Sequence, residues 1–191
     1  MDKGRLEAFS DGVIAILITI MVLELGLPRG ANPAALVELA PIFLGYALSF
    51  VLLATYWNNH HHMLQAIEQV NGRVLWANMH LLFWLSLVPF ATNWMGETAF
   101  ATWPVAVYGV LMLLCAVSFY ILLRAMLALE GPDSVLAIAL GNNIKGKISP
   151  VIYIIAIPLA FVATWIACAL YVAALVMWLI PDRRIENRLI K

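Results

Sequence analysis

The chain is poor in charge and in cysteine. Only 12% of its 191 residues are charged, the 11 basic residues balance the 11 acidic ones, and there are two cysteines. Soluble domains carry roughly 25% charged residues, so this chain would expose large apolar patches in water. It also lacks the basic excess that neutralises nucleic-acid phosphates. These shortages argue against nucleic acid as a partner and favour a protein of the lipid bilayer.

Motifs of common enzymes are also missing. The sequence has no nucleophile elbow, phosphate-binding loop, H-E-x-x-H or paired carboxylates within one helix turn. His60, His61 and His62 are consecutive, so on a helix they cannot chelate one ion; we interpret them as a solvated, titratable helix end. Cys115 and Cys168 lie in apolar runs, which favours packing over a disulfide. We expect no enzyme, catalytic residue, metal site or cofactor.

Long apolar runs, by contrast, are abundant. Hydrophobic residues make up 64% of the chain, and a membrane span needs about 20 of them. The charge-free run 148–180 would form a helix about 50 Å long, too long for a core of about 30 Å, so we split it near 163–166. One steeply tilted last helix, giving five spans, is the alternative. The sequence predicts a single-domain, all-α membrane protein over residues 1–191, with six spans at about 9–27, 39–57, 74–94, 104–127, 148–163 and 165–180.

The distribution of basic residues supports six spans. With that count, one side of the membrane carries ten of the eleven basic residues and the other side carries only Arg29. Such asymmetry is the positive-inside pattern, which predicts a multi-pass protein of the cell (inner) membrane with both termini cytoplasmic. Because no secretory cleavage pattern follows the N-terminus, we expect the first helix to be retained. The ten residues are Lys3, Arg5, Arg73, Arg124, Lys145, Lys147, Arg183, Arg184, Arg188 and Lys191.

The first predicted helix carries an aliphatic stripe. At 100° per residue, Ile16, Thr19, Ile20 and Leu23 share one face, while Asp11 lies on the opposite face. This spacing is typical of ordinary helix–helix packing. The less common alternative is a pore lining, in which branched aliphatic side chains gate ion flow and a threonine hydroxyl contacts the ion. Periodicity leaves both interpretations open.

The segment before this stripe resembles a known family. Arg5-Leu6-Glu7-Ala8-Phe9-Ser10-Asp11 matches the R-x-x-x-F-S-D signature of the transmembrane protein 175 potassium-channel family. One copy of the motif and one six-helix unit are typical of its bacterial branch. The resemblance implies a potassium-permeable, leak-like cation channel that assembles as a homotetramer around a pore lined by the first helix. The chain contains no TVGYG-like filter, so carbonyl-ring selectivity is not expected.

The resemblance also implies roles for individual residues. Ile16 would form a hydrophobic constriction for monovalent cations, with further layers at Thr19 or Ile20 and at Leu23. The motif residues would form a structural latch that orients the pore helix; they are Arg5, Phe9, Ser10 and Asp11.

Four polar residues are candidate partners of this latch. His80, inside the third span, is either hydrogen-bonded elsewhere in the bundle or a partner of Ser10 or Asp11, with Asn78 as an alternative. Asn58 and Asn59, at the cytoplasmic end of the second span, would lie at the same level as the motif.

The sequence also gives two interpretations of Glu24 and two alternative functions for the protein. Glu24, near the outer end of the first helix, is either a cation-attracting residue at the pore mouth or a plain interfacial acid. The alternative function is a small proton- or cation-coupled carrier in which Asp11, Glu24 and His80 form a relay. A structural membrane subunit without transport is a third hypothesis.

Overall fold

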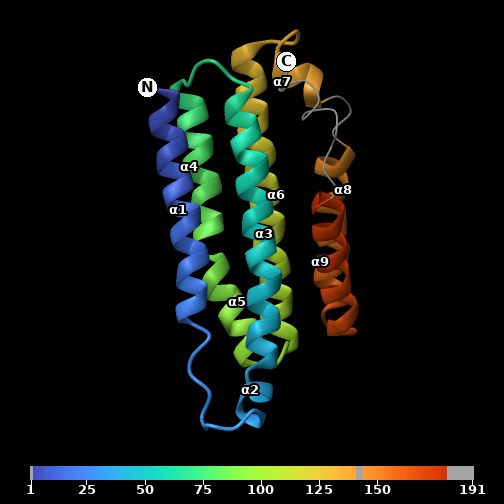
Figure 1. The fold of residues 1–191 in the computed structure, drawn as a ribbon. Coiled ribbons are helices and arrows are strands. Elements are labelled where there is room, and N and C mark those ends of the chain that lie inside the picture. The colour runs from blue at the N-terminus through green and yellow to red at the C-terminus, as the bar shows by residue number, and fades with distance from the viewer. Residues whose placement is uncertain (1, 141–143, 180–191) are drawn as a thin grey trace.

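The computed structural model describes residues 2–140 and 144–179, and within these ranges the regular elements are α-helices. The long helices run up and down along one axis, so that α1 begins at the end of the bundle where α3 and α6 end (Figure 1). The helices are α1 (Lys3–Leu23), α2 (Ala34–Glu38), α3 (Ala40–Gln65), α4 (Gly72–Ser86), α5 (Val88–Glu97), α6 (Thr102–Glu130), α7 (Val135–Leu140), α8 (Ile144–Leu159) and α9 (Thr164–Leu179).

The third predicted span is interrupted. The helix pauses at Leu87, which ends α4 and begins α5. Pro89 lies in the first turn of α5, where its missing N–H is tolerated. Together α4 and α5 cover Gly72–Glu97, one of four helical stretches in the described chain long and apolar enough to cross a membrane.

The long charge-free run forms a helical hairpin. Helices α8 and α9 are separated by residues 160–163 and pack against each other and against α6. Each has 16 residues, about 24 Å at 1.5 Å per residue. The break comes a few residues before the expected position, because Pro158 lies in the last turn of α8. The end of the last predicted span, residue 180, lies outside the described residues.

Several hydroxyl groups in the core bond to one another or to the backbone. Ser49 Oγ lies 2.6 Å from Thr92 Oγ1 and 3.1 Å from the Tyr108 hydroxyl, so one buried cluster joins α3, α5 and α6. The Tyr171 hydroxyl of α9 donates to the Val105 carbonyl of α6 at 3.0 Å. Such bonds between helices satisfy polar groups that lipid cannot.

Gly96 gives a stability prediction. An added Cβ there would lie 2.7 Å from the Ile42 Cα, on the backbone of α3. We expect Gly96→Ala to lower the free energy of unfolding by about 1–3 kcal/mol, because backbone cannot move aside as a side chain can. The measurement is unfolding of the purified protein in mixed micelles titrated with a denaturing detergent. Gly72→Ala is the matched control, since nothing lies within 4 Å of its added Cβ. Equal stability of the two variants would contradict the prediction.

Candidate functional site on the first helix

Helix α1 has one packed face and one free face. Its buried residues contact the bundle, which α1 joins through α3, α4 and α5. The aliphatic stripe lies on the free face: the exposed fraction is 58% for Ile16 and 81% for Leu23, and Thr19 and Ile20 are also exposed. The stripe is therefore not used for packing within one subunit. The buried residues of α1 are Leu6, Ser10, Ile14, Leu17 and Met21.

A buried hydrogen-bond chain joins α1, α4 and α3. Asn78 Nδ2 donates to Ser10 Oγ at 2.9 Å, and Ser10 Oγ donates to the Leu6 carbonyl at 2.8 Å. On its other side, Asn78 Oδ1 lies 2.6 Å from His60 Nε2. An amide oxygen accepts only, so His60 Nε2 carries the proton. All three side chains are buried. This chain fixes the rotation of α1 about its own axis.

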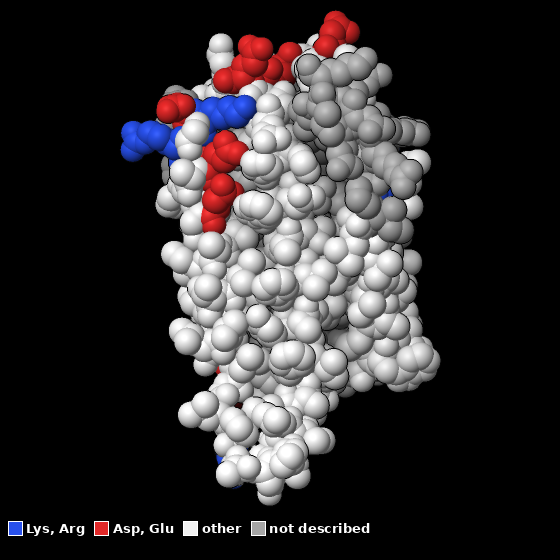
Figure 2. Space-filling view, viewed as in Figure 1, with Lys and Arg blue, Asp and Glu red and all other residues white. Residues whose placement is uncertain are grey.

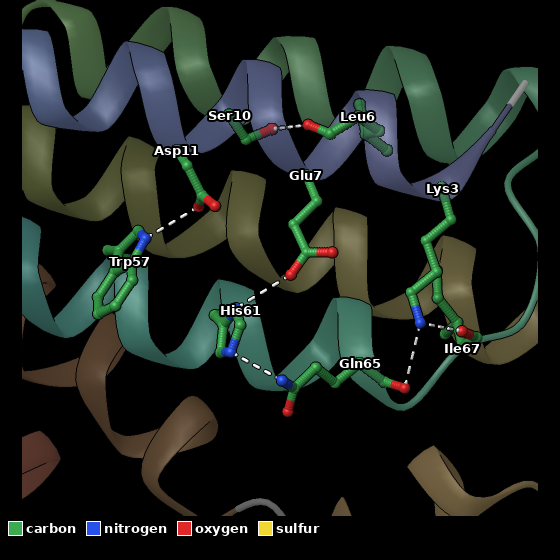
Figure 3. A network of polar contacts seen from close by, with 9 residues as sticks. All are labelled: Lys3, Leu6, Glu7, Ser10, Asp11, Trp57, His61, Gln65 and Ile67. Carbon is green, nitrogen blue, oxygen red and sulfur yellow. Dashed lines mark hydrogen bonds and ion pairs between the residues drawn. The ribbon is translucent and has the colours of Figure 1, made fainter.

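A second set of contacts forms a ladder between α1 and α3 (Figure 3). Trp57 Nε1 donates to Asp11 Oδ1 at 2.9 Å, and His61 Nδ1 lies 3.0 Å from Glu7 Oε1. Lys3 Nζ donates to the Ile67 carbonyl at 2.8 Å and to the Gln65 carbonyl at 3.3 Å. Asp11, Glu7 and Lys3 on α1 and Trp57, His61 and Gln65 on α3 recur every four residues, about one turn, which matches two antiparallel neighbours. Ile67 lies just beyond the end of α3. The ladder sets the axial register of α1 against α3.

The structure assigns only part of the predicted latch to these contacts. Ser10 and Asp11 take part as described, each bound to a neighbouring helix. Arg5 is exposed and forms no ion pair in the described part of the chain, and the Phe9 side chain is 50% exposed. Within one subunit, therefore, Arg5 and Phe9 do not join the latch.

Among the candidate partners, Asn78 meets the motif and the other three do not. Of the two alternatives for His80, the structure fits a bond elsewhere in the bundle: His80 lies exposed on α4, and its Nε2 accepts from Trp84 Nε1 of the next turn at 2.9 Å. Asn58 is exposed, and Asn59 Nδ2 donates to the Thr55 carbonyl of its own helix. Neither side chain forms a hydrogen bond with α1 within the described residues.

Two of the three histidines of α3 are linked to the motif segment, His61 directly through Glu7 and His60 through Asn78. His60 is buried and His61 pairs with Glu7, so the prediction of a solvated helix end is wrong for His60. The recurrence of Trp57, His61 and Gln65 every four residues was the signal that could have revealed this face of α3.

Glu24 ends α1 but does not lie on the stripe. Its Oε2 atom is buried and has no hydrogen-bond partner within the described residues. The side chain lines a small cavity with Tyr46 of α3 and with Thr92 and Asn93 of α5. This position favours an interfacial acid over a residue at a pore mouth.

The residues of the carrier relay are not brought together. Asp11 and Glu24 lie 13 positions apart on the chain, which is about 20 Å along a helix. His80 is on a different face of α4 from Asn78, the α4 residue that contacts Ser10 of α1. The structure therefore offers no proton path through these three residues.

The distribution of charge completes the class assignment. On the face drawn in Figure 2, charged side chains gather at the end where α1 begins, and the middle of the face is uncharged. With four spanning-length apolar stretches and interhelical hydrogen bonds in the core, these features define a multi-pass α-helical membrane protein.

Comparisons with known proteins identify the family. Residues 5–89 match the family model described as "Endosomal/lysosomal potassium channel TMEM175". A potassium channel of Chryseobacterium sp. (strain P1-3) is 49% identical over 189 residues, covering 99% of this chain and 98% of the relative. The crystal structure of a lysosomal potassium-selective channel TMEM175 homolog from Chamaesiphon minutus superimposes with a TM-score of 0.81 at 27% identity, covering 92% of this chain and 95% of the other. The chain belongs to the TMEM175 family. These relatives are named channels, in agreement with the expectation that the chain is not an enzyme.

Proposed function

We propose that the protein is a potassium-permeable, leak-like cation channel of the cell membrane. In this proposal it is a homotetramer, and α1 of each subunit lines a central pore. The observation that carries the proposal is the free face of α1, whose aliphatic residues Ile16, Ile20 and Leu23 are exposed although they belong to a helix packed on its other side. The names of the relatives, which are potassium channels, support potassium as the permeant ion.

The constriction is assigned to the level of Ile16. A ring of branched aliphatic side chains excludes water and hinders ions by dewetting. One turn further along, Thr19 Oγ1 donates its proton to the Ile16 carbonyl at 2.9 Å, which leaves the oxygen lone pairs available to a cation. Leu23 forms the outermost layer. One subunit supplies only one wall of such a pore, so the proposal requires several copies.

In this proposal the latch holds the pore-lining face of α1 in position. Ser10 is bound through Asn78 and Asp11 through Trp57, on the side of α1 away from the stripe. These contacts support a role in presenting the stripe to the pore axis. Arg5 and Phe9, which are exposed in one subunit, remain available for contacts between subunits.

The proposed topology has six spans and cytoplasmic termini. Counting α4 with α5 as one pass and α8 and α9 as two gives six passes of alternating direction. All but one of the described basic residues then fall at the end where α1 begins, and Arg29 lies in the connection at the opposite end (Figure 1). The four basic residues of the tail, Arg183, Arg184, Arg188 and Lys191, lie outside the described residues.

The test is potassium flux into proteoliposomes containing the purified protein, with subunit number measured by native mass spectrometry. We expect flux that rises linearly with the gradient and the mass of four subunits. A folded tetramer without flux above empty vesicles would refute the channel. Saturable, proton-coupled uptake would favour the carrier instead, and a protein that stays monomeric would refute the shared pore.

Glu24 gives a prediction within this proposal. A ring of carboxylates at a pore mouth would concentrate cations, so its removal would lower flux about tenfold at low ionic strength. Because Glu24 faces α3 and α5 instead, we expect Glu24→Gln to change potassium flux by less than about twofold. The measurement is proteoliposome flux at low and high salt. A salt-dependent loss of flux would contradict this prediction and would indicate that Glu24 lies at the pore mouth.

A further inference from the structure

A cavity lies inside the subunit, away from α1. It has a volume of about 50 Å³, lies between α3, α6, α8 and α9, and is partly open to the outside of the subunit. Since about 10–15 Å³ on this measure suffices for one water molecule, the cavity holds several non-hydrogen atoms. No residue of α1 lines it, so it is separate from the proposed pore.

The walls of the cavity are apolar and uncharged. Aliphatic and aromatic side chains dominate them, among them Leu52, Ala116, Phe119 and Leu123, and no charged side chain is part of the described lining. A water molecule would form few hydrogen bonds in such a space, whereas an ordered water needs two to four polar partners. An ionised group would also be costly there without a counter-charge. The walls therefore select a neutral ligand with a hydrocarbon body.

The lining contains three tyrosines, Tyr56, Tyr120 and Tyr153, whose hydroxyls have no hydrogen-bond partner within the described residues. Tyr153 is only 4% exposed, yet its hydroxyl forms no hydrogen bond within the described residues, and neither does the hydroxyl of Tyr56. Buried tyrosine hydroxyls normally find a hydrogen-bond partner. By contrast, Ser149 in the same lining is satisfied, because it donates to the Lys145 carbonyl and accepts from Trp178 Nε1 at 2.7 Å. The lining therefore keeps free hydrogen-bonding groups, of which the Tyr56 and Tyr153 hydroxyls are less exposed than that of Tyr120, whose side chain is 46% exposed.

We infer that this cavity binds a neutral amphiphile, with its hydrocarbon body among the apolar side chains and a hydroxyl or carbonyl group hydrogen-bonded to Tyr56 and Tyr153. The same chemistry is available from a free medium-chain alcohol and from a neutral monoacyl lipid. On α3, Tyr56 and Asn59 of the cavity lie next in sequence to Trp57 and His60 of the latch. The ligand therefore sits against the same turns of α3 that hold α1.

The test is photolabelling of the protein in phosphatidylcholine nanodiscs with a diazirine analogue of 1-octanol, followed by peptide mass spectrometry. We expect adducts on the segments containing Tyr56 and Tyr153, and we expect an excess of a competing ligand to prevent their formation. Competition by 1-octanol would identify a free alcohol as a sufficient ligand, and competition by monoolein alone would identify a lipid chain. Adducts that neither competitor removes would overturn the inference.

Variants separate the cavity from general partitioning into the membrane. Ala116→Trp fills the cavity and should reduce the adducts to the level of a non-irradiated sample. Val117→Trp, at the next and exposed position of α6, should leave them unchanged. Ala116→Leu serves as a milder filling variant if the tryptophan disturbs folding, judged by helical circular dichroism and elution volume. Equal labelling of a folded filling variant and the unmodified protein would overturn the inference.

Discussion

Replacing Ile16 with asparagine is expected to raise potassium flux by about tenfold or more and to let sodium pass more readily. Burying an aliphatic side chain of this size is worth about 1.5–3 kcal/mol, so losing the ring lowers the cost of wetting the constriction by a comparable amount. Each 1.4 kcal/mol removed from a barrier raises a rate about tenfold. Asparagine also brings amide oxygens that contact a cation, and these do not distinguish strongly between potassium and sodium.

The measurement is flux of potassium and of sodium into proteoliposomes with equal amounts of tetramer. Val22→Asn is the matched control, since Val22 is an exposed aliphatic residue of the same helix that lies off the stripe. It should leave both fluxes unchanged. If Ile16→Asn has the conductance and ion preference of the unmodified protein, Ile16 is not the narrow ring. If both variants conduct more, the effect comes from loosened packing rather than from a constriction.

Replacing Asn78 with alanine is expected to lower the free energy of unfolding by about 2 kcal/mol, because two hydrogen bonds are lost and their partners stay buried. The bonds run to Ser10 Oγ and His60 Nε2, at 2.9 and 2.6 Å. Since the same bonds fix the rotation of α1, the proposed channel should also conduct less, even where the tetramer forms. Unfolding in mixed micelles and proteoliposome flux measure the two effects.

Asn59→Ala is the control for Asn78→Ala. Among the described residues its amide donates to Thr55 of the same helix alone, so we expect a change within about 0.5 kcal/mol. Ser10→Ala combined with Asn78→Ala should cost less than the sum of the single changes, because both remove one shared bond. Strict additivity of the two, or equal effects of Asn59→Ala and Asn78→Ala, would show that the buried chain does not stabilise the subunit.

The lengths of the apolar runs predict the helices, and the few polar residues inside those runs predict one partner of the latch. A run too long for one span indicates a break, and the chain breaks at 160–163 between α8 and α9. Asn78 is one of few polar residues inside an apolar span, so its involvement with the motif could be anticipated. Such predictions rest on the cost of polar groups in lipid, which depends on local sequence alone.

The remaining contacts depend on how two helices face each other. His60 lies on the same face of α3 as the buried Leu53 and Leu64, but three adjacent histidines suggest a polar helix end unless each is assigned to its own side of the helix. The contacts of the ladder between α1 and α3 depend on the axial register of the two helices, which the sequence of either helix alone does not specify. The same holds for His80 and Glu24. Their levels along the bundle axis can be predicted from the sequence, but the neighbours that their side chains face cannot.

The two faces of α1 give the family a way to diversify. The side chains that hold the helix in the bundle and those on its free face form two sets with no residue in common. A substitution on the free face removes no contact inside the subunit, so natural selection can change conduction without first restoring stability. Among relatives we therefore expect the residues of the aliphatic stripe to vary in size and polarity while the packed face changes little.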